Sequence, residues 1–170
     1  DALPFPAWHL FQMDQYLAKI NGERVAPVLS SRGCPFNCIF CYRGPAAGKV
    51  FRGRSPEKVV TEIEQLHKKF GIGSILFVDD IFTINQKRAE KICDLMIERK
   101  LDVSWRCQTR ADCISMVLLQ KMKAAHCLDI SMGVESGNER VLKATGKRIT
   151  KEKVREGFRM IKEVGISTSS

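Results

Sequence analysis

The 170-residue sequence has no long hydrophobic run and no leader-like start. No uninterrupted apolar stretch approaches the roughly 20 residues that a helix needs to cross a bilayer. No segment with basic, apolar and small-residue regions opens the chain, so a secretory signal is also absent. Because 44% hydrophobic residues are enough for the core of one domain of this length, these absences predict a soluble protein.

The sequence contains seven cysteines, an odd number. An odd count without a secretory signal argues against a disulfide framework and favours reduced thiols or a metal site. We therefore expect a reducing compartment, the cytoplasm, as the location.

The sequence also lacks a concentrated basic tract, although its formal net charge is +9. Lysine and arginine are spread along the whole length, which is typical of a solvated cationic surface. An anionic substrate or a nucleic acid stays open as a partner, but no basic tract supports it.

Strand-like and helix-like segments alternate along the chain. Short apolar runs predict strands, with a fifth strand beginning at Ile166, and the four complete ones are 25–31, 74–78, 103–107 and 128–132. Capping residues or an early proline, followed by apolar residues at helical spacing, predict helices that begin near 56, 86, 116 and 151. A shorter helix is expected through Val141 and Leu142 to Gly146. This alternation predicts an α/β fold with parallel strands and right-handed crossovers.

Polar and glycine-rich segments follow the predicted strands. They are a cysteine-rich loop after the first strand, then 79–80, 108–110 and 133–137. In parallel α/β folds the carboxyl ends of the strands form the functional rim, so the four segments are expected at one edge. A doubly wound sheet would give the same pattern, and four units cannot close an eight-stranded barrel.

The first of these segments contains three cysteines in a stretch of eight residues. They are Cys34, Cys38 and Cys41. A structural zinc site normally has four ligands, usually in two separated pairs, and no fourth ligand is nearby. His67 and His126 fall at helix or helix-end positions, which suit ordinary histidines better than ligands. Three thiolates would instead satisfy three irons of a four-iron cluster and leave the fourth iron open.

The other cysteines are expected to be small core residues. They are Cys93, Cys107, Cys113 and Cys127. Of these four, Cys107 ends a strand on the predicted rim.

The spacing Cys34-x3-Cys38-x2-Cys41, with aromatic Phe40 before the last cysteine and the loop after the first strand, resembles the radical S-adenosylmethionine superfamily. The segments 33–38, 79–80 and 133–137 together resemble the branch whose members often carry an N-terminal cobalamin-binding domain. The resemblance covers nearly the whole chain.

This resemblance implies a partial (β/α)6 TIM-like barrel, truncated after about four and a half βα units. Residues 1–24 would be a linker from an upstream domain, and residues 25–170 a C-terminally incomplete core. The Asp-x-His-x-x-Gly signature of the cobalamin domain is absent, so such a domain would lie upstream of Asp1.

The resemblance also implies the cofactors and the reaction. A 4Fe-4S cluster would bind S-adenosylmethionine and cleave it reductively to a 5′-deoxyadenosyl radical, or would support cobalamin-dependent methyl transfer. An electron donor such as ferredoxin or flavodoxin would be a partner. The substrate and any residue that acts on it stay unknown at this point.

Site residues follow from the same resemblance. Cys34, Cys38 and Cys41 match the cluster ligands, and Phe40 matches an aromatic residue that packs near adenine. Asp79 and Asp80 stand where many members have Gly-Gly-Glu, the segment that receives the methionine amino group.

Glu135 matches a residue that contacts the ribose hydroxyls, which suit its two acceptor oxygens. Weaker candidates for binding the methionine carboxylate share a positive charge, and they are Arg106, Arg110 and Lys147. Two alternatives remain open: an RNA methylthiotransferase-type enzyme, which the positive charge would suit, and a non-catalytic iron-sulfur or zinc-binding module.

Overall fold

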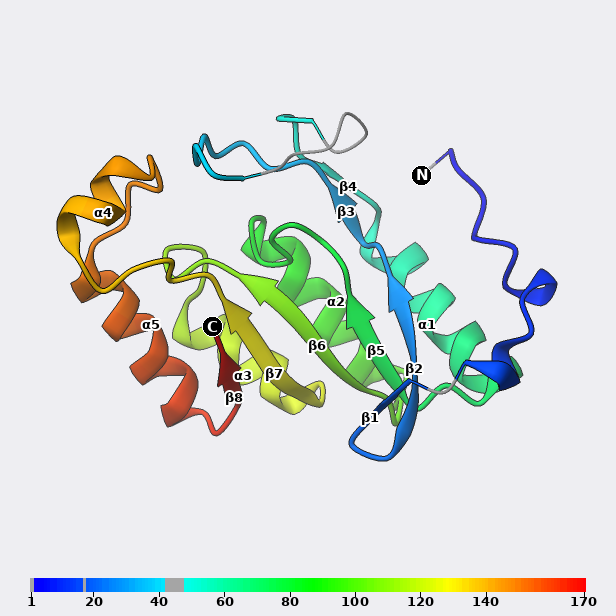
Figure 1. Cartoon of the computed structure of the whole chain (residues 1–170). Helices are drawn as coiled ribbons and strands as arrows, with labels where there is room; N and C mark the ends of the chain where they lie inside the picture. The colour runs from blue at the N-terminus through cyan, green and yellow to red at the C-terminus, as the bar shows by residue number, and fades with distance from the viewer. Residues whose placement is uncertain (1, 17, 42–47) are drawn as a thin grey trace.

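The computed structural model describes residues 2–16, 18–41 and 48–170. A six-stranded sheet in the order β1-β2-β5-β6-β7-β8 curls into a half-barrel, with helices on its outer side (Figure 1). Its strands are β1 Lys19–Ile20, β2 Glu23–Val28, β5 Ser74–Phe77, β6 Ser104–Thr109, β7 Cys127–Met132 and β8 Ser167–Ser169. All neighbouring strands from β2 to β8 are parallel. The predicted α/β fold and partial barrel are confirmed.

The helices begin where the sequence predicts. They are α1 Pro56–Phe70, α2 Gln86–Glu98, α3 Met116–Ala124, α4 Glu139–Ala144 and α5 Lys151–Glu163. The side chains of Asn85, Ser115 and Thr150 each accept a hydrogen bond from a backbone N–H of the first turn. Gly71 ends α1 in the left-handed region, at φ 62°. None of the described helices has the length and apolar character needed to span a membrane.

The start of the sheet differs from the prediction. β1 pairs antiparallel with β2 around a turn at Asn21 and Gly22, both with positive φ. Asn-Gly is a typical hairpin turn, so a sequence signal for this strand existed and was missed. The sheet therefore begins at Lys19, six residues before the first predicted strand.

The first predicted strand, 25–31, is also too long. β2 ends at Val28, and Ser31 belongs to β3 Ser31–Arg32, which pairs antiparallel with β4 Arg52–Gly53. This small ribbon lies above the carboxyl end of β2 and carries the chain out to the cysteine loop (Figure 1).

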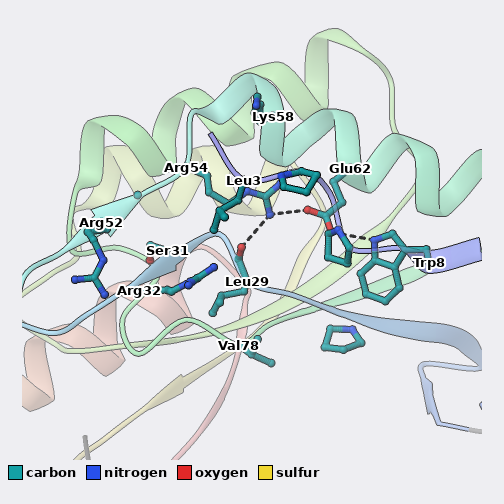
Figure 2. A pocket seen from close by; sticks show the side chains of 14 residues that line it. Leu3, Trp8, Leu29, Ser31, Arg32, Arg52, Arg54, Lys58, Glu62 and Val78 are labelled. Carbon is teal, nitrogen blue, oxygen red and sulfur yellow. Dashed lines mark hydrogen bonds and ion pairs between the residues drawn. The ribbon is translucent and has the colours of Figure 1, made fainter. Parts of the chain in front are cut away.

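The N-terminal segment packs along α1 (Figures 1 and 2). The indole Nε1 of Trp8 donates to Oε1 of Glu62 at 3.0 Å, and Arg54 forms an ion pair with Glu62 at 2.5 Å. The Glu62 side chain is 1% exposed. A carboxylate that would be costly to bury alone therefore accepts a hydrogen bond at one oxygen and is neutralised by the Arg54 cation at the other.

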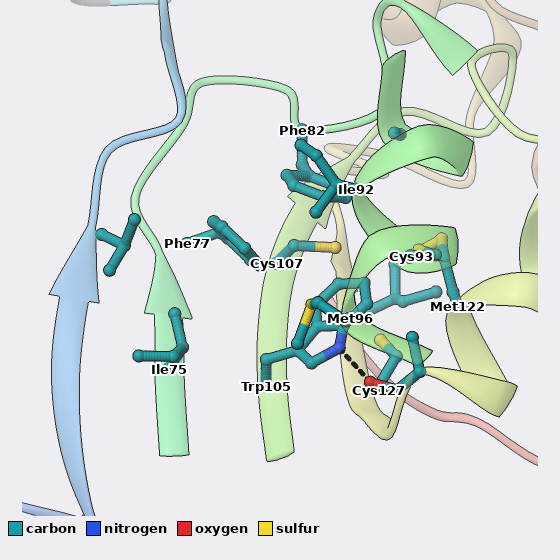
Figure 3. Packing of buried hydrophobic residues seen from close by; sticks show 14 of the residues in the cluster. Ile75, Phe77, Phe82, Ile92, Cys93, Met96, Trp105, Cys107, Met122 and Cys127 are labelled. Carbon is teal, nitrogen blue, oxygen red and sulfur yellow. Dashed lines mark hydrogen bonds between the residues drawn. The ribbon is translucent and has the colours of Figure 1, made fainter. Parts of the chain in front are cut away.

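The main core lies between the sheet and α1, α2 and α3. Phe77, Phe82 and Trp105 form a buried aromatic cluster with ring centroids 4.5–5.4 Å apart. Beside it lie Cys93 and Cys127 (Figure 3), which are fully buried in this core. Cys107 is buried there as well, so the core assignment is confirmed for these three cysteines.

The opposite, concave face of the sheet is open. Alternate residues of a strand point to opposite faces, and the register aligns Pro27, Leu76, Arg106, Asp129 and Ser167 across this face. Leu76 is 37% exposed. The concave face is thus apolar on β2 and β5 and polar on β6, β7 and β8.

Candidate functional site

The cysteine loop lies at the carboxyl-terminal rim of the half-barrel and is tied to distant segments. The Cys34 amide donates to the carbonyl of Gly48 at 3.2 Å, and the Ile39 amide donates to the carbonyl of Thr145 at 3.0 Å. The Cys41 amide donates to the carbonyl of Cys38 at 3.3 Å, which closes a turn between two of the thiols. The backbone therefore holds all three cysteines in one loop.

The three thiols of the loop differ in exposure. Cys34 is 9% exposed, Cys38 is half-buried and Cys41 is exposed. Within residues 2–16, 18–41 and 48–170, no three Cys, His, Asp or Glu side chains gather closely enough for one metal ion. One zinc ion would draw its thiolates within about 4 Å of each other. In a four-iron cluster each thiolate binds a separate iron, so three thiols on one loop fit that donor set.

Arg110 is the positively charged group that the structure places against this loop. Its Nη1 donates to Sγ of Cys38 at 3.8 Å, and its guanidinium carbon lies 3.7 Å from the ring centroid of Phe36. Its Nε and Nη2 donate to the two carboxylate oxygens of Asp112 at 2.9 Å each, and Nη2 also donates to the carbonyl of Lys147 at 2.9 Å.

Burial lowers the pKa of Arg110, but its hydrogen bonds to Asp112 and the charge of that carboxylate raise it, and the net direction is upward. The same partnership lowers the pKa of Asp112 against the opposing effect of burial. The pair therefore stays ionised, with the cation directed at the cysteine loop.

Asp79 has a structural position beneath the loop. It is 2% exposed, and its carboxylate accepts from the Ser30 amide at 2.7 Å, the Ser30 hydroxyl at 2.6 Å and the Ser31 hydroxyl at 2.5 Å. These bonds fasten the end of β5 to the chain that enters the cysteine loop. Asp80 is exposed at the same rim.

Glu135 and Lys147 lie together on the far side of the loop. Nζ of Lys147, a residue 5% exposed, donates to Oε1 of Glu135 at 2.8 Å and to the carbonyl of Gly133 at 2.6 Å. Glu135 has φ +68°, a region that residues other than glycine rarely adopt. The lysine thus holds the backbone and side chain of the 133–137 segment in place.

The predicted residues fall into three groups. Contacts link Cys38, Arg110, Lys147 and Glu135 in one continuous chain. The carboxylate of Asp79 accepts hydrogen bonds from two serine hydroxyls. Phe40 is 49% exposed, so its ring is available for stacking. Arg106 lies on the concave face of β6, four residues before the rim, and its Nε is buried without a hydrogen-bond partner among the described residues.

Several residues that position the site side chains were not predicted. Ser30, Ser31, Phe36 and Asp112 hold Asp79 or Arg110, and only the position of the two serines directly before the cysteine loop could have suggested them. Cys113 is buried as expected, but it packs with Cys34 and Ile81 beneath the rim and not in the main core.

Comparisons with known proteins agree with this geometry. The sequence model of the Radical SAM superfamily matches residues 28–170. A protein of Pyrococcus horikoshii described as "Uncharacterized methyltransferase PH0819" is 37% identical over 98% of this chain and 36% of its own length. The anaerobic magnesium-protoporphyrin IX monomethyl ester cyclase of Rubrivivax gelatinosus is 32% identical over 97% of this chain and 30% of its own length. The chain thus spans about a third of these relatives.

Solved structures share the fold. The radical S-adenosylmethionine methyltransferase TsrM from Kitasatospora setae, with cobalamin and a [4Fe-4S] cluster bound, aligns with a TM-score of 0.77 at 20% identity over 86% of this chain and 28% of that one. The cobalamin-dependent S-adenosylmethionine radical enzyme OxsB aligns with a TM-score of 0.73 at 26% identity over 84% of this chain and 22% of that one. With the family match and the cysteine loop at the barrel rim, these findings show that the chain belongs to the radical S-adenosylmethionine superfamily.

Proposed function

We propose that the chain is the catalytic core of an enzyme in which Cys34, Cys38 and Cys41 hold a 4Fe-4S cluster with one open iron. The observation that carries the proposal is the single loop of three thiols at the barrel rim, with the Arg110 cation against it. When bound, the cluster supplies the electron that cleaves S-adenosylmethionine to methionine and a 5′-deoxyadenosyl radical.

We assign three rim residues to the nucleoside and the amine. Asp80 is exposed and would accept from the methionine amino group, whereas the oxygens of Asp79 are already occupied. Glu135 keeps one carboxylate oxygen free of the Lys147 ion pair, and it would accept from the ribose hydroxyls. Phe40 would stack on adenine.

Arg106 is the best candidate for the methionine carboxylate. An arginine remains charged in proteins, and a buried donor without a hydrogen-bond partner is costly. A carboxylate would satisfy its buried Nε. Arg110 and Lys147 suit this role less, because their donors are mostly used within the chain.

The whole protein would carry out methyl transfer, with cobalamin supplied by a domain outside this chain. The support is the family and the descriptions of the relatives as a methyltransferase and a cobalamin-dependent enzyme. A cytoplasmic one-electron donor such as ferredoxin or flavodoxin would reduce the cluster.

Anaerobic reconstitution with iron and sulfide tests the open iron. The reduced cluster should give an electron paramagnetic resonance spectrum that changes when S-adenosylmethionine is added. An unchanged spectrum would show that the cofactor does not reach the cluster.

The carboxylate assignment is tested on the reconstituted chain by equilibrium dialysis of S-adenosylmethionine. Arg106→Gln should weaken binding about 10- to 100-fold, because loss of a charge-assisted bond costs roughly 1.5–3 kcal/mol. Arg159→Gln, on the exposed side of α5, is the matched control and should leave affinity unchanged. Equal affinity in the two variants would exclude Arg106 from the site.

A further inference from the structure

A pocket of about 460 Å³ lies between the N-terminal segment, the start of α1 and the ends of β2 and β5 (Figure 2). This volume is within the range of small-molecule sites, about 300–1,000 Å³. Its apolar lining comes from the N-terminal segment, from β2 and from the residues that directly follow β2 and β5. The apolar lining residues are Leu3, Pro4, Pro6, Trp8, Pro27, Leu29 and Val78.

The polar lining of this pocket is positively charged. Arg32, Arg52, Arg54 and Lys58 line it together with one acidic residue, Glu62. The Arg54 guanidinium neutralises Glu62 at 2.5 Å and donates to the carbonyl of Leu29 at 3.0 Å. Arg32 is exposed and lines the same pocket.

The pocket adjoins the predicted reaction site. Leu29 and Val78 end the apolar half of the concave face, and Val78 is 45% exposed. Ser31 lines the pocket and also donates to Asp79 beneath the rim. Arg32 precedes Cys34 by two residues. A molecule in this pocket would reach the rim along the start of the cysteine loop.

We propose that the pocket binds the substrate, and that the substrate has an apolar skeleton with an anionic group such as a carboxylate, sulfonate or phosphate. The skeleton would lie against Trp8, Leu29 and Val78, and the anion would face Arg32. This inference rests on the proposed function, because it identifies the ligand as the molecule that the radical attacks.

Two fluorescent probes of nearly equal shape test the pocket in the reconstituted chain. 1-Anilinonaphthalene-8-sulfonate carries an anionic group, and N-phenyl-1-naphthylamine has the same rings without it. The anionic probe should bind at least fivefold more tightly. Arg32→Gln should remove most of this preference and leave the neutral probe unaffected, while Leu29→Gln should weaken both probes.

The control for charge is Arg159→Gln, and circular dichroism checks that each variant is folded. Equal affinities of the two probes, or equal effects of Arg32→Gln and Arg159→Gln, would overturn the inference. If the reduced cluster still responds to S-adenosylmethionine in that case, the pocket assignment fails alone. If the probes discriminate but the cluster does not respond, the pocket stands as an anion-binding site and the proposed function fails.

The contacts of Arg110 independently carry a second inference. An arginine has five N–H donors, and this one uses four of them on Cys38, Asp112 and the carbonyl of Lys147. The guanidinium also stacks on the ring of Phe36, and the residue is only 5% exposed. The cation is therefore held rigidly against one cluster-ligand sulfur.

The geometry points to Arg110 as a positioning residue that raises the reduction potential of the cluster. Hydrogen bonds to the ligand sulfurs and nearby charge set such potentials. A donor and a positive charge at Cys38 would stabilise the reduced, more negative state of the cluster.

A redox titration followed by electron paramagnetic resonance tests this role without measuring turnover. Arg110→Gln should shift the midpoint potential to a more negative value, and Arg110→Lys, which keeps the charge, should shift it less. Arg159→Gln should not shift it. An unchanged potential in Arg110→Gln at equal iron content would overturn the inference. If Arg110→Gln fails to load iron, the midpoint potential of Arg110→Lys is the deciding measurement. A wild-type potential in Arg110→Lys would also overturn the inference.

Discussion

Cysteines occur in two regions of this molecule that give the same side chain opposite properties. Cys34, Cys38 and Cys41 lie on a rim loop with increasing exposure along the chain, while Cys93, Cys107 and Cys127 are sealed between the sheet and α2 and α3. Burial raises the pKa of Cys93 and of Cys127, which keeps those thiols protonated. Since only the thiolate binds metal or acts as a nucleophile, the environment decides which cysteines have a chemical function.

The largest difference between the two regions should be in iron binding. Cys38→Ala should reduce the iron content after anaerobic reconstitution to near zero, because a ligand is lost. Cys93→Ala should retain the wild-type iron content, measured by a colorimetric iron assay. Equal iron contents in the two variants would remove the distinction between rim and core.

Alkylation should separate the two regions by orders of magnitude in rate. In the cluster-free chain at pH 8, iodoacetamide should modify Cys41 first, because it is exposed. Cys93 and Cys127 should react only when the fold opens. Peptide mass spectrometry over time measures the order, and early labelling of the core cysteines in the folded chain would contradict it.

The free energy of unfolding should depend on the core cysteines and not on the rim cysteines, the reverse of iron binding. Cys93→Ser places a hydroxyl in a fully buried site and should cost about 1–3 kcal/mol. Cys41→Ser changes an exposed thiol and should alter the free energy of unfolding of the cluster-free chain very little. Urea unfolding followed by circular dichroism compares the two, and a similar loss in both would mean that the loop contributes to the core.

Cys113 is buried like the core cysteines but packs against Cys34 of the rim loop. Its substitution should have the smallest effect, a change in how the free energy of unfolding depends on pH. Burial, followed by the charge of Asp112, raises its pKa to about 11 from an ordinary value of 9.0. Between these values the folded chain keeps a proton that the unfolded chain releases, so stability is full below about pH 9 and falls as the pH rises to about 11. Cys113→Ala should make this decline shallower by at most ~1.4 kcal/mol per pH unit, measured by urea unfolding at pH 8, 9 and 10. An identical decline would contradict the assignment.

Local signals predicted the helices and most strands well. Asn85, Ser115 and Thr150 cap helices through contacts within three residues, so their effect can be read from adjacent sequence. The end of the first strand was wrong because Ser31 pairs with Gly53, a partner 22 residues away. The first hairpin was missed although its Asn21-Gly22 turn is a local signal.

The roles of the charged residues could not be predicted in the same way. Asp79 and Asp80 were predicted to receive the methionine amino group. In the structure Ser30 and Ser31, 49 and 48 residues away along the chain, donate hydrogen bonds to the carboxylate of Asp79. Arg110 was one of three weaker candidates for the methionine carboxylate, and its contacts reach Cys38 and Lys147 on two other loops. Hydrogen bonds between distant segments form only after the strands align, and no spacing along the sequence encodes them.

The sequence by itself determined the α/β alternation, the helix starts and the three clustered thiols, because each depends on residues close together in the chain. Only the tertiary structure decided which charges face the thiols, which acidic residue is free and where a ligand-sized pocket opens beside the loop. Those features depend on the curvature of the sheet, which brings the ends of β2, β5, β6 and β7 to one rim.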